Sequence, residues 1–569
     1  KANKNKQQQQ QMKQLISQYT QQEDFLSSKF EDHSNLVIDL SAQSTLTDEN
    51  APVLAGAIEK CVNVKTLKLL LSDYMNNNEV SVETAQCFGK AIGKCLNLTK
   101  LELDLRQKIA TQMVIYGNIS SESIVELMTG FKECVNIRTL KLNLDGCQIG
   151  HKAGIGVGMV LQSFQNLTDL EIDFNSNSIG DERSSGIMQG LQNCQNLKIL
   201  NLNLKITSNG LSILGAGLVK CQNLQILDLG LSGNQITDQG LLCLTSVLGE
   251  LKYLEVLKLD LGVYNYFNNY QDIGISGLGK GIGKCENLNN LSLILSQVCL
   301  SREWKQVAAI QDLTDGIANC KKLLALSIIY SQSKINGKTV AQLFFGLKPL
   351  TNLTSLNLQL GNNNISKTEP DSFLVLLENK VNLRSLSLNF QQNTKLNYIL
   401  NNLRLLQIVK YLYQLKNRHN ELADEEISYL SEGISKCINI ETLYNKLFEN
   451  QFGSEGVCIL EAGLGNCSNL KNQYYLYLHG HNESSQGVSG LFNGLKNCTT
   501  IENLEVYLRY SKTCDEGIID LSNAIVNLVN LNSLKLDLRN NFIADPVKQT
   551  LKEKLDSFEK LVNKEINQV

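Results

Sequence analysis

The sequence predicts an α/β solenoid in which short parallel strands form a sheet and helices cover its other side. The first observation is a nine-residue pattern that recurs along the chain, for example at 223–231 (NLQILDLGL) and 530–538 (NLNSLKLDL). Its leucines alternate with polar residues, which is typical of a strand that is buried on one face. The second observation is the spacing of the copies, often 30 residues and otherwise mostly 27 to 39. A period of this size indicates an array of small stacked repeats rather than one globular core.

Between the strands, a second pattern predicts helices. Residues 210–221 read GLSILGAGLVKC, and Leu211, Leu214 and Leu218 fall on one face of a helix. Strands that are joined by helices must run parallel. Each repeat is therefore expected to contain a strand, a turn rich in Asn and Gly, a helix and a return loop.

The pattern L-x-x-L-x-L, followed by a variable turn and a helix with small residues, resembles the leucine-rich-repeat family in its long-repeat, ribonuclease-inhibitor-like class. The resemblance covers residues 35–545. It implies a horseshoe, with the parallel β-sheet on the concave face and the helices on the convex face. We expect about 14–16 repeats in this continuous solenoid. A low-complexity tail and cover segment (1–34) precedes it, and a C-terminal capping helix (546–569) follows.

The expected elements are least regular at the ends and in one internal stretch. Residues 1–11 are rich in Lys, Asn and Gln and are expected to form a frayed tail, while 12–30 are expected to form a short helix. The repeat pattern is weakest between 391 and 480, with a degenerate repeat expected near 408–415. After Pro546, apolar residues return at helical spacing, at Leu551, Leu555, Phe558 and Val562.

Ten of the sixteen cysteines share one register, three residues before the Leu, Ile or Val that opens a strand. They are Cys61, Cys95, Cys134, Cys194, Cys221, Cys285, Cys320, Cys437, Cys467 and Cys498. Equivalent positions of stacked repeats lie side by side, so we expect a column of small, buried, reduced thiols under the return loops. The sequence contains no C-x-x-C pair, which disfavours a zinc site. Persistently reduced thiols favour a cytoplasmic protein.

Composition disfavours several classes of function. The net charge is −3, so the chain lacks the basic field of a nucleic-acid-binding protein. It also lacks a stretch of 18 apolar residues, so no membrane span is expected. The Lys-, Asn- and Gln-rich composition is similar to that of ciliated and other protists with biased proteomes, which suggests by analogy a ciliary or cytoskeletal setting.

Candidate catalytic and ligand motifs are weak. Residues 274–281 come within one residue of a phosphate-binding loop, but the Ser or Thr that would hold magnesium is missing. The segment also falls where a helix is expected. Its glycines, like Gly154, Gly156 and Gly158, are therefore expected to let a helix approach the sheet. The pair His479 and His481 has no third ligand placed by the sequence. We expect no enzyme, no cofactor and no metal.

The polar residues between the strand leucines are the first candidate binding residues, because strand alternation points them away from the core. The acidic ones are Glu102, Asp104, Glu171, Asp173, Asp228 and Asp260. These six acids stand against three lysines, Lys68, Lys141 and Lys258, which makes this part of the face mildly acidic. Further along, the corresponding residues are neutral, as in Ser327 and Asn357. The face either docks a basic or mixed-charge protein or is simply a solvated sheet surface.

Aromatic residues are the second candidate. An insertion at 262–272 carries Tyr264, Tyr266, Phe267 and Tyr270, and the next turn contains Trp304, the only tryptophan. Grouped exposed aromatic residues beside charges are typical of interface cores. The alternative is that the rings fold back and cover their own repeat.

Two functions are compatible with these observations. The favoured one is a non-enzymatic protein–protein interaction scaffold that uses the concave face and the rim loops. The alternative is a GTPase-activating protein, because the Ran GTPase-activating family resembles this class of repeat. That family carries a strongly acidic segment after its repeats, whereas residues 552–569 mix Lys with Glu.

Overall fold

A computed structural model gives the fold of the chain. The structure describes residues 16–41, 48–71, 80–106, 119–147, 149–177, 180–263, 268, 270–298, 303–363, 365, 372–377, 380, 382–390, 393, 411–416, 424, 427–428, 431, 435, 441–446, 453–466, 469–477, 489–490, 495, 498–511, 513–558 and 560–567.

The chain divides into two compact units. Unit 1 contains residues 1–270 and 280–288, and unit 2 contains 271–279 and 289–569. Helix α10 (Asp272–Ile282) contributes residues to both. Each unit is built from alternating parallel strands and helices.

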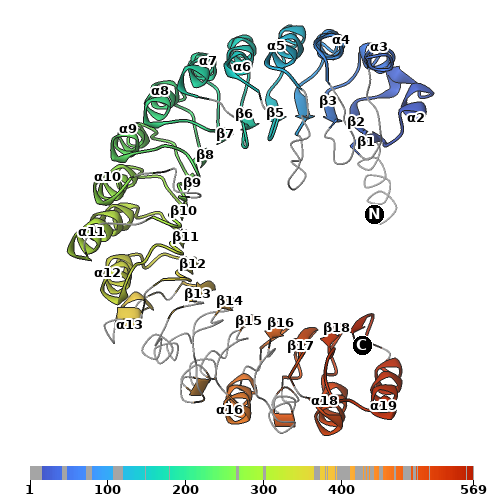
Figure 1. Ribbon diagram of the computed structural model, residues 1–569, viewed down its shortest axis with the longest axis vertical. Helices are drawn as coiled ribbons and strands as arrows, with labels where there is room; N and C mark the ends of the chain where they lie inside the picture. The colour runs from blue at the N-terminus through green and yellow to red at the C-terminus, as the bar shows by residue number, and fades with distance from the viewer. Residues whose placement is uncertain are drawn as a thin grey trace, which may run out of the picture. The chain divides into compact units, whose positions relative to one another are not determined.

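Unit 1 places its strands on one side and its helices on the other (Figure 1). The strands are β1 (Ile16–Tyr19), β2 (Asn35–Asp39), β3 (Thr66–Leu70), β4 (Lys100–Asp104), β5 (Thr139–Asn143), β6 (Asp169–Asp173), β7 (Ile199–Asn203), β8 (Ile226–Gly230) and β9 (Val256–Asp260). The helices are α2 (Gln22–Leu26), the short η1 (Phe30–Asp32), α3 (Ala51–Glu59), α4 (Val82–Gly93), α5 (Ser121–Gly130), α6 (His151–Ser163), α7 (Asp181–Leu191), α8 (Ser208–Leu218) and α9 (Asp238–Leu248). Neighbouring strands pair in parallel.

Unit 2 repeats the same plan. Its strands are β10 (Asn290–Ile294), β11 (Ala325–Ile329), β12 (Ser355–Gln359), β13 (Ser385–Asn389), β14 (Tyr411–Lys416), β15 (Thr442–Lys446), β16 (Asn472–Tyr477), β17 (Asn503–Tyr507), β18 (Ser533–Asp537) and β19 (Asn563–Asn567). Its helices are α11 (Glu303–Asn319), α12 (Gly337–Leu347), α13 (Ser372–Leu377), α16 (Ser454–Leu464), α18 (Asp515–Asn527) and α19 (Asp545–Asp556). These strands also pair in parallel. The expected parallel sheet with helices on its other side is therefore confirmed.

The core lies between each sheet and its helices. In β8, Leu227 and Leu229 are fully buried, while the residues that alternate with them are partly exposed. Leu211, Leu214 and Leu218 of α8 are also fully buried. Complete burial of a leucine side chain contributes about 1.5–3 kcal/mol, so the two periodic patterns supply most of the driving force for this fold.

A ladder of asparagines ties each turn to the preceding one. Asn234 accepts a hydrogen bond from the Ile206 amide at 2.7 Å and donates to the Leu204 carbonyl at 2.8 Å. Asn177, Asn268, Asn363 and Asn541 make equivalent pairs of contacts with the turn before their own. Buried backbone groups are costly when unpaired, so these Asn side chains form the hydrogen bonds that the backbone N–H and C=O groups of the turns require. The leucine pattern alone does not predict these residues, although four of the five stand four residues after a strand and Asn268 stands eight residues after β9.

The cysteine column is present in the described residues. Cys61, Cys95, Cys134, Cys194, Cys221, Cys285, Cys320 and Cys498 are buried and are not joined in disulfides, which confirms the expected burial. Cys437 and Cys467 lie outside the described residues. Several of these thiols donate to a carbonyl of the preceding repeat, as when Cys95 donates to the Ile58 carbonyl at 3.6 Å and Cys134 to the Ile92 carbonyl at 3.2 Å.

The glycines of the helices serve a different contact from the expected one. A Cβ on Gly158 of α6 would collide with the carbonyl oxygen of Gly186 in α7, and one on Gly279 of α10 would collide with the Asp312 carbonyl in α11. A Cβ on Gly89 of α4 would lie 2.7 Å from the Leu127 carbonyl of α5. The missing side chains therefore let neighbouring helices approach each other, and the expected approach to the sheet is wrong.

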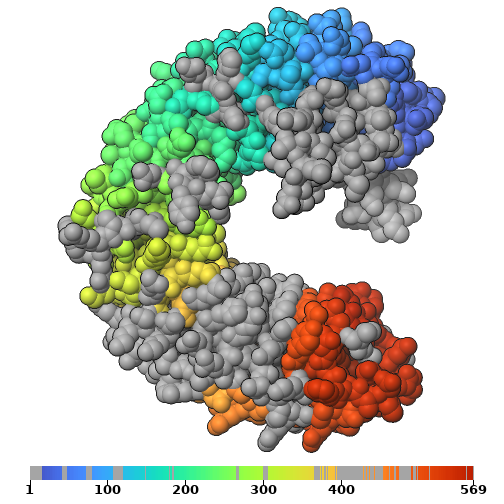
Figure 2. Space-filling model, viewed as in Figure 1, coloured from blue at the N-terminus to red at the C-terminus, as the bar shows by residue number. Residues whose placement is uncertain are grey.

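The two ends of the described chain, coloured blue and red in Figure 2, also differ from expectation. The helix expected over 12–30 is wrong: the chain forms strand β1, which pairs with β2, and then the short helix α2. At the other end, α19 buries Leu551 and Leu555 as expected, but Val562 lies beyond this helix and is exposed. Strand β19 follows and pairs with β18, so the C-terminal cap contains a strand as well as a helix.

Two irregular stretches of the repeat pattern lie in unit 2. Strand β14 lies at the expected degenerate repeat. In β16, Gln473 aligns with Leu443 and Leu504 of the neighbouring strands, so a polar residue occupies a leucine position. The pairing shifts within β16, which explains why the leucine pattern is lost there.

Candidate interaction faces of the two units

The exposed faces of the sheets are the candidate sites. In β4, Leu101 and Leu103 are buried, whereas Lys100, Glu102 and Asp104 are partly exposed. We call the first, third and fifth residues of β2–β9, together with polar residues two positions after a strand, such as Arg106 after β4, the unit 1 face. The corresponding residues of β10–β13 form the unit 2 face.

Four acidic residues of the unit 1 face, Glu102, Asp104, Glu171 and Asp228, are paired with cations. Glu102 lies between Lys68, at 3.3 Å, and Lys100, at 2.8 Å. Burial alone raises the pKa of Glu102, but the two lysines outweigh burial and hold that pKa below its ordinary value. Because strands lie about 4.8 Å apart, charges on equivalent positions of neighbouring strands can meet in this way.

Three further pairs continue this pattern. Lys141 and Glu171 are 2.5 Å apart, Lys258 and Asp228 are 3.2 Å apart, and Arg106 and Asp104 are 3.0 Å apart. Glu171 raises the pKa of Lys141. Burial raises the pKa of Asp104, although Arg106 opposes this effect. Partly exposed pairs of this kind each contribute about 0.2–1 kcal/mol, so their main effect is to hold the side chains in place.

The excess of negative charge is therefore greatest on one strand, β6. Lys100 and Arg106 add cations beside Glu102 and Asp104 that the sequence interpretation omitted. Strand β6 carries three acids, Asp169, Glu171 and Asp173, and Lys141 pairs with Glu171 only. A hollow of about 220 Å³ lies over β3–β6. Its polar lining consists of Lys68, Glu102, Asp104, Lys141, Asn143, Glu171 and Asp173. Asp260 lies further along, where its carboxylate accepts the Gly262 amide at 3.0 Å.

The expected aromatic cluster is only partly described. Tyr264, Tyr266 and Phe267 lie outside the described residues. Tyr270 is 2% exposed, and its hydroxyl donates to the Leu261 carbonyl, so this ring packs within its own turn. The expected position of Trp304 in a loop is wrong, because this residue lies near the start of helix α11. Its side chain is outside the described residues. The aromatic contact site remains a prediction for the three residues of the insertion.

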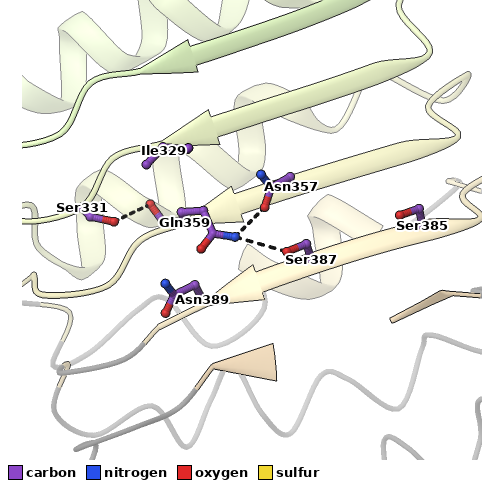
Figure 3. A pocket seen from close by; sticks show the side chains of 7 residues that line it. All are labelled: Ile329, Ser331, Asn357, Gln359, Ser385, Ser387 and Asn389. Carbon is purple, nitrogen blue, oxygen red and sulfur yellow. Dashed lines mark hydrogen bonds between the residues drawn. The ribbon is translucent and has the colours of Figure 1, made fainter. Parts of the chain in front are cut away.

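The unit 2 face has no charged residue along β10–β13. Its polar side chains are hydroxyls and amides, and its apolar ones include Ile294 and Ile329. A shallow hollow of about 590 Å³ lies over β11–β13 (Figure 3). It is lined by Ile329, Ser331, Asn357, Gln359, Ser385, Ser387 and Asn389.

Gln359 organises this hollow. Its side-chain nitrogen donates to the Asn357 amide oxygen at 2.5 Å and to the Ser387 hydroxyl at 3.2 Å (Figure 3). Asn357 in turn donates to the Ser327 hydroxyl at 2.8 Å. The side chains of three neighbouring strands are therefore linked into one hydrogen-bonded network.

The weaker motifs carry no site in the described structure. Helix α10 contains residues 274–281, so the glycine-rich segment does not connect a strand to a helix as a phosphate-binding loop does. His479 and His481 lie outside the described residues. Where the structure is described, no three His, Cys, Asp or Glu side chains group closely enough to hold a metal ion. None of the described helices is long and apolar enough to cross a membrane.

Comparison with known proteins identifies no family for this chain. No protein-family model matches the chain, and no curated protein matches it. Among solved structures, the chain is similar to one from the Toll–Spätzle complex of Drosophila, with 14% sequence identity and a TM-score of 0.41. The match covers 93% of this chain and 61% of that one. The repeats themselves, with their leucine-lined parallel strands, opposing helices and Asn ladder, define a leucine-rich-repeat solenoid.

Proposed function

We propose that this protein is a non-enzymatic scaffold for protein–protein interaction that binds its partners on the exposed faces of its sheets. The observation that carries this proposal is the pre-organised polar surface of unit 1, where cross-strand ion pairs hold charged side chains in fixed positions. Pre-organisation lowers the entropy cost of binding. The mixture of both charge signs, with an acidic centre on β6, favours a basic or mixed-charge protein partner.

The class of repeat and the cellular setting belong to the same proposal. Helices of 11 residues, such as α8 and α9, and a repeat length near 30 support the ribonuclease-inhibitor-like class. The buried free thiols support a reducing compartment, which favours a cytoplasmic protein. A place in a larger ciliary or cytoskeletal assembly agrees with the composition. The rim aromatics Tyr264, Tyr266 and Phe267 remain candidate contacts.

The first prediction compares the same substitution in two ion pairs, one on the sheet face and one on the helix side of unit 1. Lys141→Glu reverses a charge on the unit 1 face, beside Glu171. Lys152→Glu reverses a charge on the helix side, where Lys152 pairs with Glu122 at 2.5 Å. We expect Lys141→Glu to lower capture of a specific partner by about tenfold, because a misplaced charge at an interface core costs more than 1 kcal/mol. Lys152→Glu is expected to retain that partner.

Quantitative mass spectrometry of affinity-captured proteins measures both variants against the wild type. Equal capture by all three proteins would contradict the use of the unit 1 face. A single-turnover GTP hydrolysis assay with small GTPases tests the alternative function. Acceleration of hydrolysis by the chain would replace the scaffold proposal with a GTPase-activating one.

A further inference from the structure

The hollow over β11–β13 differs in chemistry from the charged hollow over β3–β6 of the unit 1 face. Its lining contains three hydroxyls and three amides but no charged side chain. Asn357 and Gln359 are partly exposed, so their amides are accessible from the hollow. Ile329 adds a partly exposed apolar contact on β11.

The hydrogen-bonded network leaves specific groups available. Both of these hydrogen bonds of the Gln359 side chain use its nitrogen, so its side-chain carbonyl oxygen can still accept a hydrogen bond. The Ser387 hydroxyl accepts from Gln359, so its own proton can be donated. The Ser327 hydroxyl accepts a hydrogen bond from Asn357, so its own proton can also be donated. The hollow therefore presents an acceptor next to donors on neighbouring strands, held in place by the network.

This arrangement discriminates between ligands by charge. A carboxylate or ammonium group that enters the hollow loses water and meets no opposite charge, which is costly. A primary amide has both a donor and an acceptor, so it can pair with the Gln359 oxygen and the Ser387 hydroxyl together. The described part of this face offers no exposed aromatic ring to stack on a sugar, since Tyr330 is 1% exposed. The lining consequently favours a peptide amide over a carbohydrate.

We propose that the hollow over β11–β13 binds an extended, uncharged peptide segment of a partner protein through its Asn or Gln side chains. This inference deepens the proposed scaffold function and rests on it. Successive side chains of an extended segment point to opposite sides, so alternate Asn and Gln residues can enter the hollow while the others face solvent. Ile329 would contact the aliphatic part of the same segment.

The test uses the full chain and two labelled peptides with blocked ends. The first is Gly-Ser-Gln-Ser-Asn-Ser-Gln-Ser-Gly, and the second replaces its Gln and Asn residues with Glu and Asp. Fluorescence polarisation measures the dissociation constant of each. We expect the amide peptide to bind and its carboxylate counterpart to bind at least about tenfold more weakly, because the carboxylates are desolvated without a partner. Equal affinity of the two peptides, or no binding of the amide peptide, would overturn the proposal.

Matched variants locate the binding. Gln359→Leu is expected to weaken the amide peptide at least about fivefold, and Ser387→Ala to weaken it to a smaller extent. Gln342→Leu is the control, because Gln342 lies on α12 in the same unit and bonds to Gln311 of α11. Circular dichroism checks that each variant is folded, and Gln359→Glu, which keeps the shape but adds a charge, replaces Gln359→Leu if that variant fails to fold. Equal weakening by Gln342→Leu, or displacement of the peptide by a neutral oligosaccharide, would count against the peptide site.

The two proposals can fail separately. If the peptides behave alike but Lys141→Glu still loses its partner, only the amide site is wrong. If Lys141→Glu and Lys152→Glu behave alike while the amide peptide binds as expected, only the proposed binding of a partner to the unit 1 face is wrong.

Discussion

The buried position that follows each helix is most often a cysteine, whose thiol donates to nearby carbonyls, although Phe164, Leu251 and Leu350 occupy it in other repeats. Cys221 donates to the Leu191 carbonyl at 3.6 Å and to the Gly217 carbonyl at 3.8 Å. Burial raises the pKa of the Cys221 thiol to about 12, so the thiol keeps its proton at neutral pH. Lys380 occupies the same register in unit 2, fully buried, and donates to the carbonyls of Leu347, at 3.0 Å, and Leu350, at 3.2 Å. A longer donor therefore replaces the thiol in one repeat.

Lys380 leads to a prediction about the pH dependence of stability. Burial lowers the pKa of Lys380 from 10.5 to about 8, so the folded protein releases this proton at a lower pH than the unfolded chain does. The cost of burying the ammonium is present in full below pH 8 and is relieved as the pH rises from about 8 to 10.5. We expect wild type to gain stability relative to Lys380→Met over this window, by roughly 3 kcal/mol at most.

Urea unfolding of both proteins between pH 7 and pH 10.5 measures this difference. Other groups that titrate in the window are common to the two proteins, so their contributions cancel in the comparison. A difference in unfolding free energy that stays constant with pH would show that Lys380 is not the source.

At the scale of elements, the spacing of neighbouring helices depends on glycines. Gly158 of α6 faces Gly186 of α7, and Gly93 of α4 faces Gly130 of α5. The sequence shows that helices carry small residues at these positions but not whether a sheet or another helix lies opposite them. That distinction depends on how each helix is rotated about its own axis. The positions of the apolar residues do not fix this rotation closely enough to separate the two cases.

The helix contact predicts opposite outcomes for two identical substitutions. Gly158→Ala places a methyl group against the backbone of α7, which cannot move aside as a flexible side chain does. We expect a loss of about 1–3 kcal/mol in unfolding free energy, as in other overpacked cores. Gly56→Ala in α3 is the control, because nothing lies within 4 Å of its added Cβ. It is expected to gain up to about 1 kcal/mol from helix propensity. Thermal and urea unfolding measure both, and destabilisation by Gly56→Ala similar to that by Gly158→Ala would contradict the helix–helix interpretation.

At the scale of the whole molecule, the leucines predict the fold much better than the site. Leu227 and its counterparts identify the strands because burial repeats at every second residue, and this holds until a polar residue such as Gln473 takes a leucine position. The ion pairs follow from register, since Lys68 pairs with Glu102 and Lys141 with Glu171 across adjacent strands. Lys100 and Arg106 do not belong to the leucine-flanked positions on which the sequence interpretation was based. Their omission made the unit 1 face look more evenly acidic than it is.

The corrected charge distribution leads to the last prediction, which concerns β6. Asp169 and Asp173 form no ion pair with any cation in the described parts of unit 1, whereas the neighbouring Glu171 is paired with Lys141. Unpaired acids on a sheet face attract a basic partner over distances of about 10 Å at about 0.1 M salt, and over about 30 Å at about 0.01 M. We therefore expect the double variant Asp169→Asn and Asp173→Asn to slow association with the captured partner about three- to tenfold and to flatten the dependence of the rate on salt.

The matched control makes the same change in net charge on the helix side, with Glu83→Gln and Glu133→Gln, both exposed. If the net charge of the chain alone steered the partner, both double variants would slow association equally. If the local field of β6 steers it, only the sheet-face variant is slow, and the two rates converge at about 1 M salt, where screening acts within about 3 Å. Stopped-flow or surface-based measurement of the association rate over a salt series distinguishes these outcomes. The association rate reports electrostatic steering, whereas the dissociation rate reports the loss of contacts. An unchanged association rate in the β6 variant would therefore place the partner away from this strand.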